Sequence, residues 1–270
     1  MYLAAVIQMT STSDPEANWD QARRLIERAA AYGAKLVATP ENANFLGLPE
    51  QKVRTAEPLD GPTCRRFADL AARLGIHLLL GSFNERGDDP ARCHNTSVVF
   101  GPDGSTLAAY RKIHLFDVDV SDAVRCRESE CVAAGDRPIV VATPLGRLGL
   151  SICYDLRFGN LYRRLVGEGA EMLCVPAAFT LTTGRDHWEP LLRARAIECQ
   201  SYVLAPAQYG RHDDPSLRES YGHAMIIDPW GHVIAQASDG PGLALAEIDL
   251  DRVARVRRAI PVGAHFRPDL

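Results

Sequence analysis

Three short apolar segments of this chain each stop at an ionisable residue. They are residues 35–39 before Glu41, residues 105–110 before Lys112 and residues 147–152 before Cys153. Their length and their aliphatic and β-branched side chains predict buried strands. A side chain just past such a strand lies outside the carboxyl end of a sheet, where open α/β folds usually place their chemistry. We therefore expect a sheet-based fold in which a carboxylate, an ammonium and a thiol can converge at one edge.

Strands and helices alternate along the rest of the chain. Asp14 and Pro15 open a helix with a regular apolar stripe, and Gly75 ends a second helix over residues 62–74. The other predicted elements are strands at 1–9, 76–80, 95–100, 139–142, 172–175, 202–205 and 243–248, a hairpin turn at 229–231, and helices near Leu161, at 187–198 and after Asp249. This alternation predicts mixed sheets covered by helices. Because no linker interrupts it, we expect residues 1–270 to form one domain.

The composition argues against several classes of function. Hydrophobic residues make up 46% of the 270 residues and charged residues 24%, which is ordinary for a soluble globular protein. A net charge of -4 gives no reason to expect binding to nucleic acid or to a membrane, and no apolar run approaches the ~18 residues of a membrane span. The seven cysteines are scattered and odd in number, which indicates free thiols and a cytoplasmic location. Without a secretory signal, the glycosylation motif at residues 95–97 is a chance match.

Other catalytic and binding motifs are weak or missing. Gly149, Ser151 and Cys153 approach the Gly-x-Ser-x-Gly nucleophile elbow, but a cysteine replaces the last glycine, which argues against a serine hydrolase. The eight histidines form no His-Glu-x-x-His motif, and Cys126 and Cys131 lack a second pair of ligands. There is also no phosphate-binding or dinucleotide-binding loop. We therefore expect neither a metal nor a cofactor.

The three ionisable residues lie in sequence contexts that resemble one family. Glu41 lies in Pro-Glu-Asn, Lys112 in Tyr-Arg-Lys-Ile-His-Leu-Phe-Asp-Val-Asp, and Cys153 in Ile-Cys-Tyr-Asp-Leu-Arg-Phe. These contexts resemble the Glu-Lys-Cys triad of the nitrilase superfamily of carbon-nitrogen hydrolases. Segments similar to the Nit branch follow in the same order at residues 176–184, 187–189, 192–198, 220–225, 228–231 and 267–270. The resemblance covers nearly the whole chain and implies a four-layer αββα sandwich with mixed sheets.

The resemblance also implies a role for each residue of the triad. Cys153 is expected to attack an amide carbonyl and to form a covalent acyl-enzyme. Glu41 is expected to take the thiol proton and later to activate the water that releases the acyl group. Lys112 and the main-chain N–H of Tyr154 are the expected donors to the oxyanion.

Members of the family carry a second glutamate near the triad. We assign this role to Glu128, because the following serine resembles the pattern of the branch, and Glu130 is the alternative. The second glutamate is expected to orient Lys112 or the attacking water. The chain departs from the branch after the nucleophile, where Gly159 and Asn160 replace Pro-Glu, and this leaves the start of the next helix in doubt.

The implied activity is that of a thiol amidohydrolase that releases ammonia from a small carboxylated amide. The segments 207–212 and 220–223 are closer to amidases of deaminated glutathione than to omega-amidases. Deaminated glutathione is therefore the first substrate expected, with 2-oxoglutaramate or an N-carbamoyl compound as the alternatives. An alternative of another class is a catalytically idle binding partner, which the intact triad argues against.

A carboxylated substrate needs a cation in the pocket, and arginine holds a planar anion better than lysine does. We expect Arg157, four residues after the nucleophile, to bind the remote carboxylate, and a structural pair with Asp155 is the alternative. The other residues expected to bind substrate are Tyr154 and, in the loop after a strand ending at Val175, Phe179, Thr182 and Thr183.

In this family, dimers form through the helix after the nucleophile strand and the helix that contains Arg193 to Cys199. A homodimer or higher homo-oligomer is therefore expected here. The apolar residues available for it are Leu161, Leu165, Leu191, Leu192 and Ile197. Packing of the same residues within the chain is the alternative.

Overall fold

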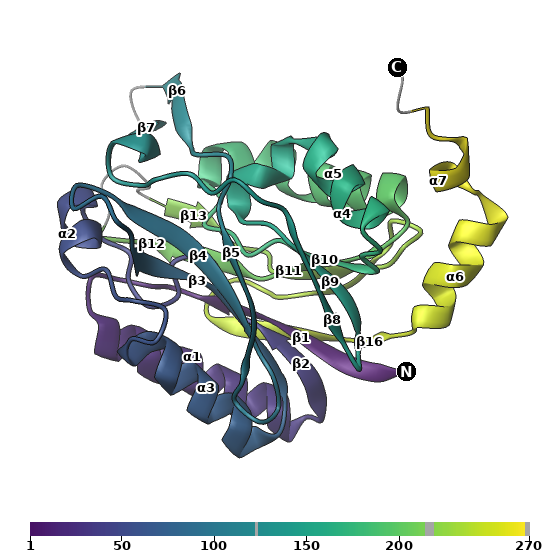
Figure 1. The fold of residues 1–270 in the computed structure, drawn as a ribbon, viewed down its shortest axis with the longest axis horizontal. Coiled ribbons are helices and arrows are strands. Elements are labelled where there is room, and N and C mark those ends of the chain that lie inside the picture. Colours follow the sequence, from purple (N-terminus) through teal and green to yellow (C-terminus); the bar gives the residue numbers. More distant parts are fainter. Residues whose placement is uncertain (122–123, 214–218, 268–270) are drawn as a thin grey trace.

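The computed structural model describes residues 1–121, 124–213 and 219–267. Its helices are α1 (Pro15–Ala31), α2 (Pro49–Arg54), α3 (Pro62–Leu74), α4 (Gly159–Gly167), α5 (Leu181–Cys199), α6 (Leu250–Ala259) and α7 (Val262–His265). Two sheets pack face to face, α1 and α3 cover one outer face, and α4 and α5 cover the other, as Figure 1 shows. The expected αββα sandwich is confirmed. In the described part of the chain, no helix is both long and apolar enough to cross a membrane.

The first sheet contains the strands that carry Glu41 and Lys112. Its strands are β1 (Tyr2–Met9), β2 (Ala34–Ala38), β3 (His77–Arg86), β4 (Cys93–Phe100), β5 (Thr106–Arg111), β12 (Ala207–Arg211), β13 (Glu219–Tyr221) and β16 (Gly242–Ile248). Their order is β13-β12-β1-β2-β3-β4-β5, and β16 also pairs with β1. Strands β1, β2 and β3 are parallel, whereas β4 and β5 continue the sheet in antiparallel pairs.

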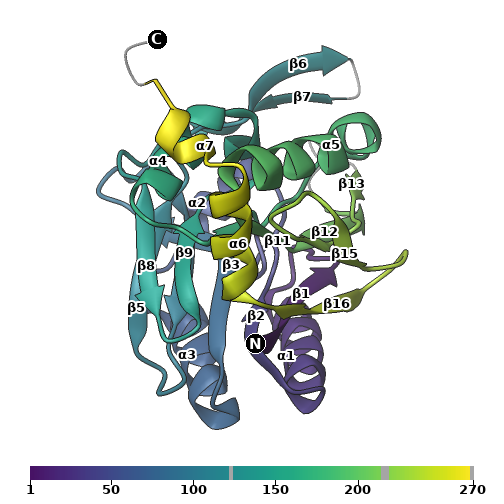
Figure 2. The same cartoon turned by 90° about the vertical axis from the view of Figure 1, so that its right-hand side faces the viewer.

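The second sheet carries the cysteine. Its strands are β8 (Ile139–Thr143), β9 (Gly146–Leu150), β10 (Met172–Cys174), β11 (Tyr202–Ala205), β14 (Met225–Ile227) and β15 (Val233–Gln236). The order is β15-β14-β11-β10-β9-β8, with a parallel centre formed by β9, β10 and β11. A separate hairpin of β6 (Asp117–Ser121) and β7 (Val124–Arg127) projects beyond the sandwich in Figure 2.

Alternate residues of β1 face different layers of the sandwich. Ala4 and Val6 pack into the core cluster between the sheets, whereas Ala5 and Ile7 pack with residues of α1 and α3. All four side chains are fully buried. A strand buried on both faces shows a continuous apolar run rather than an alternating one. This explains why the first nine residues are apolar yet form a strand.

The predicted helix ends of the first half are confirmed. The Asp14 side chain accepts the N–H groups of Glu16 and Ala17 at the start of α1. Gly75 ends α3 in the left-handed conformation, with φ of 62°. The uncertain helix after the nucleophile does form, and α4 begins at Gly159 without a side-chain cap.

The predicted start of the helix at residue 187 is wrong. Helix α5 begins at Leu181, so Thr182 and Thr183 lie in its first turn and not in a loop. Threonine and glycine have low helix propensity, which hid this turn in the sequence. Tertiary packing overrides propensity here, because a Cβ at Gly184 would lie only 2.3 Å from the Cβ of Tyr221 in β13. Close packing on β13 therefore depends on glycine at this position.

Two tight backbone features place the loop that carries Glu41. Asn42 has φ of 56°, a left-handed conformation that asparagine tolerates better than most residues, and its N–H is bonded to Ser82 Oγ at 2.8 Å. Strand β3 passes so close that a Cβ on Gly81 would lie 1.9 Å from the carbonyl oxygen of Thr39. Glycine is therefore required where β3 supports this loop.

Candidate active site

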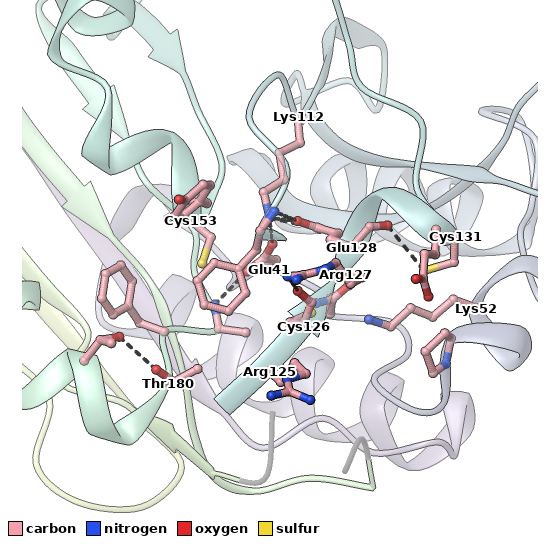
Figure 3. A pocket seen from close by; sticks show the side chains of 18 residues that line it. Glu41, Lys52, Lys112, Arg125, Cys126, Arg127, Glu128, Cys131, Cys153 and Thr180 are labelled. Carbon is pink, nitrogen blue, oxygen red and sulfur yellow. Dashed lines mark hydrogen bonds and ion pairs between the residues drawn. The ribbon is translucent and has the colours of Figure 1, made fainter. Parts of the chain in front are cut away.

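The three ionisable residues at the strand ends lie together in one cavity, shown in Figure 3. Glu41 follows β2, Lys112 directly follows β5, and Cys153 opens a 3-10 turn (Cys153–Arg157) after β9. Glu128, at the start of the 3-10 turn Glu128–Glu130, joins them. The site thus combines two groups from the first sheet, one from the second, and one from the connection between them.

Lys112 is the centre of this cluster, and its side chain is only 2% exposed. Its Nζ donates to Glu41 Oε1 at 3.0 Å and to both oxygens of Glu128, at 3.0 and 2.9 Å. Burial disfavours the ammonium, but Glu128, Glu41 and Cys153 favour it more strongly and raise the pKa of Lys112 above its usual value. Lys112 is therefore a fixed positive charge.

Glu41 is held from both sheets and is 3% exposed. Its Oε2 accepts the N–H of Ala178 at 2.8 Å, and its main-chain oxygen accepts a bond from Gln208 Nε2 at 2.8 Å. Burial opposes its charge, but Lys112, the Cys153 thiol and the Ala178 N–H together lower the pKa of Glu41. Glu41 is therefore an ionised carboxylate that faces the thiol.

Cys153 occupies a strained turn that exposes its sulfur to Glu41. Its φ is 48°, which is unusual for a residue other than glycine, and its N–H is bonded to the carbonyl of Pro176 at 2.9 Å. Burial and the Glu41 charge raise the pKa of Cys153 well above its usual value, although Lys112 acts in the opposite direction. The resting side chain is thus a neutral thiol.

Asp155 fixes this turn, a role that was not predicted from the sequence. It is fully buried and accepts the main-chain N–H of Ile152 at 2.9 Å and the hydroxyl of Tyr110 at 2.7 Å. It also accepts the main-chain N–H of His114 at 3.0 Å, and His114 Nδ1 lies 2.7 Å from the carboxylate. Because Tyr110 and His114 flank Lys112 in sequence, Asp155 ties the lysine segment to the cysteine turn.

The Tyr154 main chain offers a donor next to the nucleophile. Among the described residues, no hydrogen-bond acceptor lies in reach of its N–H. The Tyr154 ring contacts Phe116 and Phe158 edge-on, with centroid distances of 5.1 and 5.4 Å. The aromatic contacts hold the backbone in place while the N–H remains available.

The two candidate second glutamates have different surroundings. Glu128 contacts Lys112 with both oxygens, and its Oε2 accepts the main-chain N–H of Phe116 at 2.6 Å. Glu130 lines the cavity but is exposed, and it does not appear among the acceptors of Lys112. Geometry therefore favours Glu128 over Glu130 as the partner of Lys112.

The expected substrate-binding residues divide into two groups. Tyr154, Phe179 and Thr183 line the cavity, whereas Thr182 is exposed and Arg157 lies outside the lining. The Arg157 guanidinium carbon lies over two lining residues, 5.2 Å from the Phe179 ring centroid and 5.9 Å from that of Tyr154. Its nitrogens are 3.4 Å from Nδ1 of His187. The acceptors that bind Arg157 do not include Asp155, the alternative partner.

Three cations at the cavity rim were not predicted. They are Lys52, from α2, and Arg125 and Arg127, from β7. Arg125 Nε is 3.1 Å from Asp119 Oδ2, and Arg127 Nη1 contacts the carbonyls of Val118 and Cys126. These elements gave only weak periodic signals in the sequence, so their position beside the triad was not visible. Among the described residues, no group of three or more His, Cys, Asp or Glu is arranged to hold a metal.

Replacing Lys112 by methionine should destabilise the protein, because it leaves Glu41 and Glu128 without their shared counter-ion. We expect a loss of about 3–5 kcal/mol in the free energy of unfolding at neutral pH. In the wild type, the lowered pKa of Glu41 adds stability above its unfolded value of about 4.3, and this is lost as pH falls. Without Lys112, burial raises the pKa of Glu41 above its unfolded value. The variant therefore loses stability as pH rises and Glu41 ionises.

Urea unfolding at pH 5 and at pH 7.5 measures this reversal. The difference in free energy of unfolding between Lys112→Met and wild type should be smaller at pH 5 than at pH 7.5. The control is Lys35→Met, which removes an exposed lysine of β2 and should change stability by less than about 0.5 kcal/mol. An equal gap at both pH values would show that the lysine does not neutralise these carboxylates.

Comparison with known proteins identifies the family and several relatives of this chain. Residues 3–258 match the carbon-nitrogen hydrolase family. The chain is 47% identical over 275 residues to a Bos taurus protein named deaminated glutathione amidase, with 99% of this chain and 83% of that protein covered.

Two solved structures show the same fold. The C. elegans NitFhit protein has a TM-score of 0.92 at 45% identity; the match covers 99% of this chain, which spans 65% of that protein. Saccharomyces cerevisiae Nit3, a member of branch 10 of the nitrilase superfamily, has a TM-score of 0.86 at 31% identity. The match covers 96% of this chain and 94% of that protein. The chain belongs to the carbon-nitrogen hydrolase family and has the fold of the nitrilase superfamily.

Proposed function

We propose that this protein is an amidase with Cys153 as nucleophile and Glu41 as general base. The observation that carries the proposal is the pairing of opposite protonation states in one buried cluster. Cys153 has a raised pKa and is a neutral thiol, and the Glu41 that faces it has a lowered pKa and is ionised. A neutral thiol attacks an amide only if a base in contact takes its proton, and Glu41 is in that position.

The geometry supports a two-step reaction. Cys153 Sγ attacks the carbonyl carbon while its proton passes to Glu41, and the carbonyl electron pair moves to oxygen. Glu41 then gives this proton to the departing nitrogen, the carbon–nitrogen bond breaks, and a thioester remains. A water molecule, deprotonated by Glu41, adds to the thioester carbon. The carbon–sulfur bond then breaks, the carboxylic acid leaves, and the proton held by Glu41 restores the Cys153 thiol.

Lys112 and the Tyr154 main chain supply the donors for the oxyanion. Lys112 Nζ contacts Glu41 Oε1 and both oxygens of Glu128, and a substrate oxygen beside Cys153 would share one of its three protons with these acceptors. Glu128 therefore acts through Lys112 by fixing its direction. The Tyr154 N–H is the second donor, and each such donor contributes roughly 10² to 10³ in rate.

We propose a carboxylated amide as the substrate, with deaminated glutathione first. The relatives that bear the name deaminated glutathione amidase support this choice. The compound has carboxylates remote from its scissile amide, and Lys52, Arg125 and Arg127 place positive charge along the cavity rim. Arg157 is the proposed contact for a carboxylate near the aromatic wall, and Phe179, Thr182 and Thr183 are proposed to shape the same side.

A panel of amides and the variant Cys153→Ala test this function together. The expected release of ammonia applies to 2-oxoglutaramate and N-carbamoyl compounds, whereas cleavage of deaminated glutathione yields cysteinylglycine as the leaving amine, so both products are followed. We expect turnover of deaminated glutathione by wild type and none by Cys153→Ala. A quenched reaction should carry the acyl group on Cys153, detected by mass spectrometry.

Cys174→Ala is the matched control, because Cys174 is a buried thiol on the neighbouring strand β10, and no carboxylate of the described residues is bonded to it. It should retain turnover. Release of ammonia alone would assign the omega-amidase or N-carbamoyl activity. No product from any amide would favour an idle binding protein, and an adduct on Cys174 or Cys199 would overturn the choice of nucleophile.

The variant Arg157→Lys tests the carboxylate contact. Lysine keeps the charge but loses the two parallel hydrogen bonds. For a substrate with the distal carboxylate, kcat/KM should therefore fall by a factor that corresponds to a loss of about 1.5–3 kcal/mol in transition-state stabilisation. A matched amide without that carboxylate should be unaffected. Arg163→Lys is the control, since Arg163 lies over Phe266 near the carboxyl terminus. An equal loss on both substrates would make Arg157 a structural residue.

We propose a homodimer or higher homo-oligomer that forms through α4 and α5 in a cytoplasmic protein. All seven cysteines are free thiols, which supports a reducing compartment. Leu161, Leu165 and Leu192 are buried within the chain, as the alternative of core packing implied, whereas Ile197 is 52% exposed. Light scattering at micromolar concentration should give twice the chain mass of 29.6 kDa, and Ile197→Asp should reduce it. A wild-type monomer would rule out the dimer.

A further inference from the structure

Asn95 lies in contact with the charged groups of the site, although the mechanism above gives it no role. It belongs to β4 and is 3% exposed. Its Nδ2 donates to Glu41 Oε1 at 2.8 Å and lies 3.5 Å from Glu128 Oε1. Its main-chain oxygen accepts the N–H of Lys112 at 2.9 Å. One neutral residue therefore contacts both carboxylates and the backbone of the lysine.

The lone pairs of Glu41 show what this contact does. An ionised carboxylate has about four acceptor sites, two on each oxygen. Lys112 and Asn95 occupy Oε1, and the Ala178 N–H occupies one site on Oε2. By this count, the remaining site on Oε2 is the one left for the Cys153 thiol, which is hydrogen-bonded to the Glu41 side chain. Without Asn95, Oε1 has a vacant site directed away from the nucleophile.

The orientation of the Asn95 amide follows from its neighbours. If the amide were flipped, Oδ1 would face the carboxylates of Glu41 and Glu128 with no proton between them. In the orientation observed, Oδ1 is buried and has no partner among the described residues. Its cross-strand neighbour Asn84 likewise has an unpartnered Nδ2. An unsatisfied buried amide atom is costly, so the donor contact to Glu41 outweighs it.

We propose that Asn95 is a positioning residue that holds Glu41 by Oε1 so that Oε2 alone can receive the thiol proton. The inference rests on the proposed function in one respect, the transfer of that proton from Cys153 to Glu41 during amide hydrolysis. It also assigns a role to Asn95, the first residue of the chance glycosylation motif at residues 95–97. A buried asparagine engaged with two carboxylates is closed to glycosylation.

The variant Asn95→Ala tests the proposal through the pH dependence of Cys153 alkylation by iodoacetamide. This rate depends on ionised Glu41 as the base and needs no amide substrate. A hydrogen bond to a carboxylate favours its charged form, so loss of the amide should move the acidic limb of the rate profile up by roughly one to two pH units. The modified cysteine is identified by peptide mass spectrometry.

Asn84→Ala is the matched control, because Asn84 is 2% exposed, pairs with Asn95 across the strands and, within the described part of the chain, is bonded to neither carboxylate. It should lower stability without moving the limb. If Asn95→Ala does not fold, Asn95→Ser replaces it, since its hydroxyl ends one bond short of the amide nitrogen and should give the same shift. If the acidic limb of the alkylation rate profile lies at the same pH in wild type, in Asn84→Ala and in the folded Asn95 variant, the proposal is wrong.

The substrate assays separate this inference from the proposed function. If wild type hydrolyses no amide but the alkylation limb still shifts in Asn95→Ala, the positioning role stands and the activity is wrong. If wild type hydrolyses the amide and the limb does not shift, the activity stands and Asn95 is only structural.

Discussion

The buried ammonium of Lys112 is the interaction on which the rest of the site depends. It lies between the carboxylates of Glu41 and Glu128, all largely withdrawn from water. A carboxylate in that environment without a counter-ion would take up a proton, and a protonated Glu41 has no use as a base. The lysine keeps Glu41 charged and so allows a neutral thiol and an ionised base to remain in contact. The strong charges are thus arranged to preserve a difference in protonation rather than to create a thiolate.

The fold supplies this arrangement by bringing loops from both sheets to one edge. Glu41 and Lys112 follow strands of the first sheet, and Cys153 follows a strand of the second. Asp155 joins the cysteine turn to the residues around Lys112, and the Ala178 N–H joins the second sheet to Glu41. Because each loop is bonded to another across the interface, no single strand sets the geometry. The left-handed backbone of Asn42 is held by Ser82 Oγ, and that of Cys153 by the carbonyl of Pro176.

The sequence predicted those parts of the site that have strong local signals. Helices α1 and α3 carry caps that act within a few residues, and the strand ends before Glu41 and Cys153 are apolar runs that stop abruptly. The predictions failed where tertiary contacts decide the outcome. The first turn of α5 is disfavoured by its threonines and glycine, yet packing on Tyr221 forms it. The partners Asp155 and Gln208 were not identified, because their hydrogen bonds join segments 41 and 167 residues apart.

The location of the site at the junction of the sheets also has a consequence for the order in which the protein matures. The bond between the Ala178 N–H and Glu41 closes a loop of 137 residues, and that between Gln208 and the Glu41 carbonyl closes a longer one. Contacts so distant in sequence carry a high entropic cost and form only when most of the chain is compact. The second sheet alone would leave the sulfur without its base, and the first sheet alone would leave Glu41 and Lys112 without the nucleophile. The reactive centre therefore cannot exist in a half-assembled chain, which protects a newly made protein from premature chemistry at its own nucleophile.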